Sequence, residues 1–107
     1  MFTVNTKRTY KYPVSLTVYD EHGKEISGKF KATFKAMPQN ELRDLPADTL
    51  LLDHVLVSVD EICLTDDEGK ELAGDDKLQA AKNDPAISTA LVNAYHESVS
   101  KKNRPRI

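Results

Sequence analysis

Cysteine, tryptophan and glycine are scarce in this sequence: its 107 residues include one Cys, no Trp and four Gly. The single thiol, Cys63, cannot form a disulfide within the chain, so the fold must depend on a hydrophobic core. No apolar run approaches the roughly 20 residues that a membrane-spanning helix needs, and residues 1–10 lack the apolar stretch of a signal peptide. We therefore expect one globular domain, without a membrane segment, in a reducing cytoplasm.

The residue patterns that carry common chemistry are also missing. The three histidines, His22, His54 and His96, have no metal-binding spacing from one another or from Cys63. The segment LTDDEGKE resembles a calcium loop, but counting back from Gly69 as the sixth position places a leucine where the first Asp ligand belongs. No Gly-rich phosphate loop follows a strand, and no Gly-x-Ser-x-Gly elbow occurs. We predict no catalytic residue, no metal and no cofactor; in an enzyme, His54 and Cys63 would be the first candidates.

Charge is distributed unevenly along the chain, although its net value is only −2. Residues 1–36 hold seven Lys/Arg and three Asp/Glu, residues 37–100 hold four and fourteen, and residues 101–107 hold four and none. In the first segment the cations alternate with apolar residues, as on the exposed face of a sheet. The acidic middle is typical of exposed helix faces and turns.

The first third of the sequence predicts an antiparallel hairpin. Residues 12–20 alternate apolar and polar side chains at the two-residue period of a half-buried strand. The turn is DEHGKE, in which Gly23 can adopt a positive φ. In the return strand, residues 26–37, Phe30 and Phe34 fall on one face and the lysines on the other. Residues 1–6 would add a third strand or fray.

After residue 38 the apolar period changes from two to about 3.6, which predicts helices. Residues 38–45 are expected to form one or two helical turns that Pro46 ends. Residues 46–64 favour a helix capped by Asp48 or Thr49, although their Val-rich centre, VLVSV, is also compatible with a strand. A polar turn follows, with Gly69 at its pivot.

Two further helices are expected near the end of the chain. One is GDDKLQAAKN, and the other begins after Asp84 as the N-cap, with Pro85 in the first turn. The whole pattern predicts an α+β fold, in which an N-terminal antiparallel β-hairpin or small sheet packs against C-terminal α-helices. We expect one domain over residues 1–103 and a disordered basic tail over residues 104–107.

The order of these segments resembles the small tail assembly chaperones of long-tailed phages and prophages. The resemblance spans residues 13–103 and rests on FKATFKAMPQNEL, the Leu-rich LLLDHVLVSVDEI, the turn DDEG and the closing DPAISTALVNAYHESVSKKN. Many members carry Trp and Gly in the segment that matches VSVDEICLTDDEG, where this chain has Glu61 and Ile62 and no Trp.

The resemblance implies a non-enzymatic protein of the bacterial host cytoplasm that binds the helical tape-measure protein until tail-tube subunits replace it. A groove between the Leu-rich and closing helices could receive a partner helix. The residues expected to contact that partner are Leu52, Val55, Leu56, Val59, Leu91 and Tyr95. A homo-oligomer is compatible with this role. Such genes often make a longer product by frameshifting near their end, and Lys102-Asn103 sits where a slippery site would lie.

One alternative is a small nucleic-acid-binding module on the basic face of the hairpin. It would use Lys7, Arg8, Lys29, Lys31 and Lys35 and would bind with steep salt dependence. The two phenylalanines of the return strand have the opposite parity to its lysines, which separates base stacking from charge and makes nucleic acid the less favoured partner.

Overall fold

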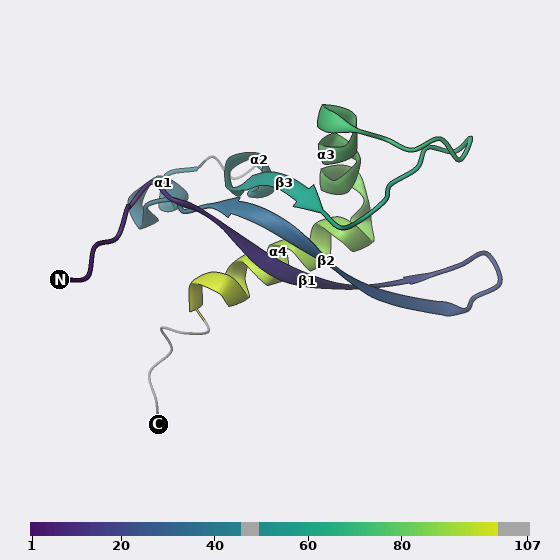
Figure 1. Cartoon of the computed structure of the whole chain (residues 1–107), viewed down its shortest axis with the longest axis horizontal. Coiled ribbons are helices and arrows are strands. Elements are labelled where there is room, and N and C mark those ends of the chain that lie inside the picture. Colours follow the sequence, from purple (N-terminus) through teal and green to yellow (C-terminus); the bar gives the residue numbers. More distant parts are fainter. Residues whose placement is uncertain (46–49, 101–107) are drawn as a thin grey trace, which may run out of the picture.

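The computed structural model describes residues 1–45 and 50–100 and has an α+β architecture, as the sequence predicts. Three antiparallel strands form one sheet in the order β1-β2-β3, and α4 lies along one face of it (Figure 1). The elements are β1 Thr9–Tyr19, β2 Glu25–Lys35, α1 Gln39–Arg43, α2 Leu52–Val55, β3 Leu56–Asp60, α3 Gly74–Asn83 and α4 Pro85–Ser100. In the described ranges, no helix is long and apolar enough to cross a membrane.

The predicted hairpin is confirmed. β1 and β2 pair over their full lengths, with Val14 opposite Phe30 and Tyr10 opposite Phe34. Gly23 has a φ of 79° in the turn, the left-handed conformation that glycine adopts without steric cost. Residues 1–8 form no strand and precede β1 as an exposed segment.

The long helix expected over residues 46–64 is wrong. Only Leu52–Val55 is helical, and the chain then continues as β3, which pairs with β2 through Ala32 opposite Val59. The strand reading of VLVSV was the correct alternative, because the second edge of β2 needs a hydrogen-bonding partner and β-branched residues suit that position. The proposed caps Asp48 and Thr49 lie outside the described residues, as do Pro46, Lys102-Asn103 and the tail.

The last helix begins as predicted. The Oδ1 atom of Asp84 accepts hydrogen bonds from the backbone N–H groups of Ala86 and Ile87, at 2.9 and 3.0 Å. This N-cap satisfies donors that the first turn of α4 would otherwise leave unpaired. Pro85 follows directly, where its missing N–H costs no hydrogen bond.

The core lies between the sheet and α4. Phe34 and Leu91 are fully buried there. The rings of Tyr95 and Phe34 pack edge to face, with their centroids 5.5 Å apart. Two hydroxyl groups of β1 also bind α4: Tyr10 and Ser98 share a hydrogen bond of 2.7 Å, and Tyr12 donates one of 2.6 Å to Glu97. These contacts fix the helix against the first half of β1.

Candidate functional site

The residues expected to contact a partner lie inside the core. Their exposed fractions run from 0% to 7%, and all belong to one cluster that also contains Phe30 and Phe34 of the sheet. The set is Leu52, Val55, Leu56, Val59, Leu91 and Tyr95. Leu56 and Val59 belong to β3 rather than to a long helix, and they share this cluster with the buried side chains of β2. A partner could reach these six only if the core opened, so we place the candidate site elsewhere.

The candidate site is an apolar groove at the outer end of the hairpin. Because side chains alternate across a strand, Leu16, Val18 and Ile26 point to the same face as the core residues Val14 and Phe30. This face continues beyond the part that α4 covers. The hydrophobic surface of the core therefore extends into solvent along the hairpin.

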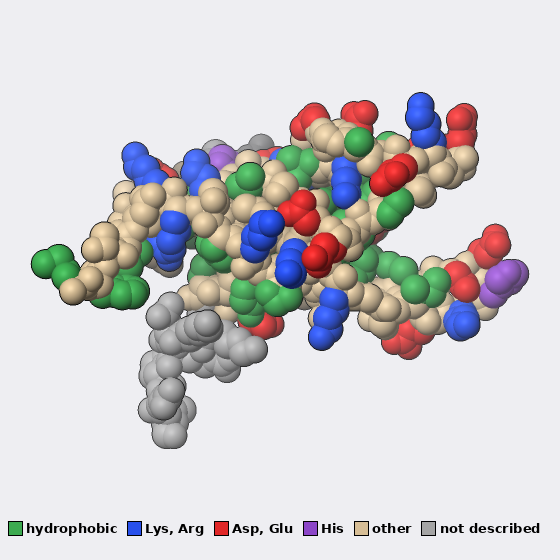
Figure 2. Space-filling model, in the orientation of Figure 1, with side chains coloured by type: hydrophobic (Ala, Val, Ile, Leu, Met, Phe, Trp, Pro, Cys, Tyr) green, Lys and Arg blue, Asp and Glu red, His purple; other side chains and the backbone are tan. Residues whose placement is uncertain are grey.

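The groove has a volume of about 170 Å³. Two cross-strand pairs form its floor, Leu16 with Gly28 and Val18 with Ile26, and Phe30 closes its inner end. Ile26 is 50% exposed, although it is one of the larger apolar side chains of the protein. Figure 2 shows hydrophobic side chains along the hairpin, in the hollow between the two protruding tips of the molecule. We call this surface, with Ile62, the hairpin groove.

Gly28 gives the hairpin groove its depth. It sits between Ile26 and Phe30 on the apolar face, opposite Leu16. A Cβ atom added at Gly28 would meet no atom within 4 Å, so the space above the backbone is open. An apolar side chain from another segment can therefore approach the sheet more closely here than at any residue with a side chain of its own.

The opposite wall of the groove comes from the segment after β3. Glu61 has a φ of 63°, which is unusual for a residue other than glycine, and this bend directs the chain so that Ile62 lines the groove. Lys31 lies 3.9 Å from the Glu61 carboxylate. The residue with the left-handed conformation, Glu61, therefore directly precedes the residue that lines the groove, Ile62.

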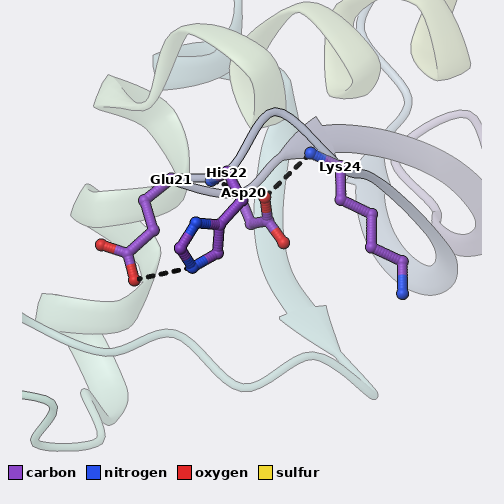
Figure 3. A network of polar contacts seen from close by, with 4 residues as sticks. All are labelled: Asp20, Glu21, His22 and Lys24. Atoms are coloured by element: carbon purple, nitrogen blue, oxygen red, sulfur yellow. Dashed lines mark hydrogen bonds and ion pairs between the residues drawn. The ribbon is translucent and has the colours of Figure 1, made fainter.

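Two acidic turns project at the groove end of the molecule (Figure 1). The first, residues 20–25, contains three carboxylates and one lysine, and the second, residues 66–71, contains four carboxylates and one lysine. Asp20 organises the first turn: its Oδ1 accepts hydrogen bonds of 2.9 Å from the N–H groups of His22 and Lys24, and the His22 ring lies 3.7 Å from Glu21 (Figure 3). The groove therefore has an apolar floor and an acidic outer end.

The basic face of the hairpin has a different construction. Lys31, one of the five cations expected to bind nucleic acid, lies 3.9 Å from Glu61, and Lys11 on the same face of the sheet lies 3.9 Å from Asp60. Phe30 and Phe34 are buried on the opposite face of the sheet. The face thus offers partly neutralised charge without those aromatic rings, an arrangement that disfavours the nucleic-acid alternative.

The residues named as enzyme candidates do not form a site in the described part of the chain. Cys63 and His54 are both exposed, and neither lines the hairpin groove. Within residues 1–45 and 50–100, no group of three or more His, Cys, Asp or Glu side chains could hold a metal ion.

Comparison of the chain with models of protein families, with curated proteins and with solved structures finds no match.

Proposed function

We propose that this chain is a tail assembly chaperone that shields an apolar helix stripe of a tape-measure protein with its hairpin groove. The observation that carries the proposal is the apolar face of the hairpin that continues past α4, where Ile62 is the one residue from outside the hairpin that lines the groove among the described residues. An open apolar strip of this kind suits reversible binding of a partner's hydrophobic side chains.

The composition around the groove supports a reversible role. Its apolar floor gives affinity for hydrophobic side chains in general, while the acidic turns keep the complex in solution and disfavour acidic partners. A chaperone that yields its client to tail-tube subunits needs modest affinity of this sort. The small groove volume, about 170 Å³, limits the contact to a few partner side chains for each copy.

The proposal is tested by binding to a helical fragment of the tape-measure protein encoded with this chain. The Ile26→Asp variant places a charge in the groove and should weaken binding at least about tenfold, since it removes the burial of a large apolar side chain. Thr17→Asp is the matched control, because Thr17 is exposed on the other face of the same hairpin and lines no part of the groove. Circular dichroism checks that both variants fold.

Equal binding by the two variants would overturn the groove assignment, and absence of binding by the unmodified chain would overturn the proposed function. Binding of an oligonucleotide that weakens steeply with salt would instead favour the nucleic-acid alternative.

A further inference from the structure

Residues 1–8 expose an apolar segment at the end of the molecule opposite the acidic turns (Figure 1). The side chain of Phe2 is 91% exposed and that of Val4 is 47% exposed. A short turn, in which the Lys7 N–H donates to Asn5 Oδ1 at 3.0 Å, sets this segment at an angle to β1. We call residues 1–8 the arm.

The arm cannot fill the hairpin groove of its own chain. Phe2 is seven residues before Thr9, so it reaches at most about 25 Å from the start of β1, and Val4 reaches at most about 18 Å. Val18, in the outer pair of the groove floor, is nine residues beyond Thr9 along β1, a distance of about 31 Å, and Leu16 lies at about 24 Å, which Val4 cannot reach. An arm in the groove must therefore come from a second copy.

The arm and the groove match in spacing. In an extended segment, Phe2 and Val4 point to the same side and lie two residues apart. The two cross-strand pairs of the groove floor, Leu16 with Gly28 and Val18 with Ile26, have the same two-residue spacing. The open space above Gly28 can receive the large ring, and the adjacent pair can receive the smaller valine.

The charges beside the arm and the groove are complementary. Residues 1–11 contain three cations and no carboxylate, whereas residues 60–71 contain six carboxylates and one lysine. Figure 2 shows acidic side chains on both tips at the groove end. When an arm lies in the groove, its Lys7 and Arg8 come towards these acids, which favours the head-to-tail arrangement over contact between like ends.

We propose that the arm of one copy binds in the hairpin groove of the next, so that the chain self-associates head to tail. Such a contact joins two different surfaces and leaves a free arm and a free groove at the ends, so it extends into chains or closes into rings. The inference does not rest on the proposed function. If both hold, a tape-measure stripe and the arm compete for one groove, and self-association protects its apolar surface before the partner arrives.

Sedimentation velocity of the full chain over a concentration series tests this proposal without any partner. The average mass of the unmodified chain should rise with concentration. Phe2→Asp disables the arm and Gly28→Phe fills the groove, and each should weaken self-association by about tenfold or more. Thr3→Asp adds the same charge beside the apolar residues of the arm but keeps Phe2, so it should weaken self-association much less than Phe2→Asp does. Thr17→Phe alters an exposed position on the other face of the hairpin and should behave as the unmodified chain does.

A mixture of the two disabled variants gives the sharpest result. Phe2→Asp retains a groove and Gly28→Phe retains an arm, so together they should form a one-to-one dimer that grows no further. Circular dichroism again confirms folding, which neither change should disturb because Phe2 is exposed and the space at Gly28 is open.

Three results would overturn the inference: an unmodified chain that stays monomeric, disabled variants that still associate, or a mixture that forms no dimer. Its failure would leave the proposed function intact, because Phe2→Asp is expected to bind the tape-measure fragment and Ile26→Asp is not.

Discussion

Asp20 and Asp66 hold two separate turns in the same way. In each turn the Asp Oδ1 accepts hydrogen bonds of 2.9 Å from the backbone N–H groups two and four residues later. Three residues after each Asp stands a glycine in the left-handed region, Gly23 with a φ of 79° and Gly69 with a φ of 80°. The segments DEHGKE and DDEGKE thus form turns of the same conformation, although they lie far apart in the sequence.

We predict that Asp20→Ala and Asp66→Ala each lower the free energy of unfolding by about 1 kcal/mol, because each removes two hydrogen bonds to backbone N–H groups. Asn retains the acceptor oxygen and should cost less. Asp67→Ala is the control, since no hydrogen bond of its carboxylate contributes to the turn. Urea unfolding measures all the variants, and a loss at residue 67 as large as that at residue 66 would contradict the account.

The hairpin could be predicted because its strands alternate apolar and polar side chains, with Pro13, Tyr19 and Gly28 as the exceptions. Alternation places Val14 and Phe30 on the buried face, and the only residue required to take a positive φ in the connection is a glycine. The last helix was equally predictable, because Asp84 is a favourable N-cap residue and Pro85 is favourable in the first turn.

The strand β3 could not be predicted from its own residues. The apolar residues Leu52, Val55 and Val59 are spaced three and four apart, which fits a helix, and the pairing of β2 decides otherwise. Thr33 of β2 lies opposite Ser58, but the next residue, Phe34, lies opposite Leu56. This irregularity in register interrupts the alternation of side chains in β3 that would have indicated a strand. Here tertiary hydrogen bonding overrides a local pattern.

The hairpin groove depends on relationships that a sequence does not contain. Leu16, Val18 and Ile26 are expected core residues by parity, and they form a groove only because α4 covers the inner half of the hairpin. The residues chosen for partner contact were the most regularly spaced apolar ones, and those are the residues that a small core needs first. The sequence offered one sign of the groove: the two predicted strands of the hairpin are longer than the stretch that the last helix can cover.

Replacing Glu61 with glycine should relieve the strain of the positive φ at this position. The left-handed region costs a residue with a side chain roughly 1 kcal/mol, while glycine pays an entropic cost on folding. We predict that Glu61→Gly raises the free energy of unfolding by about 0.5 to 1 kcal/mol relative to Glu61→Ala. Both variants lose the exposed ion pair with Lys31, so their difference isolates the backbone. Equal stability of the two would contradict the prediction, because the strain would then be no larger than the entropic cost of glycine.

The chain is predicted to act without catalysis. Cys63 and His54 are exposed, so Cys63→Ser with His54→Gln should change the free energy of unfolding by less than about 0.5 kcal/mol. Binding to the tape-measure fragment should also be unchanged, because neither residue lines the groove. A folded double variant that lost its biological activity would contradict this prediction and support an enzyme.

The hydrogen bond between Tyr12 and Glu97 should make stability depend on pH in the alkaline range. The bond to the Glu97 carboxylate, followed by partial burial and the charge of Glu97, raises the pKa of Tyr12 above its ordinary value of 10.0. The hydroxyl can donate only while it is protonated. Its contribution to stability is therefore complete below the pKa of the unfolded chain and is lost as the pH rises through the pKa of the folded protein.

Tyr12→Phe should accordingly be less stable than the unmodified protein near neutral pH, and the difference should shrink above about pH 10. Burial also raises the pKa of Tyr95, so both proteins lose stability in that range and only their difference reports on Tyr12. In a Glu97→Ala background the acceptor oxygen and its charge are both absent, and the pH-dependent part of the difference should disappear. Urea unfolding from about pH 9 to about pH 11.5 measures these curves. Parallel curves for the unmodified protein and Tyr12→Phe would show that this hydrogen bond does not link the sheet to α4 in solution.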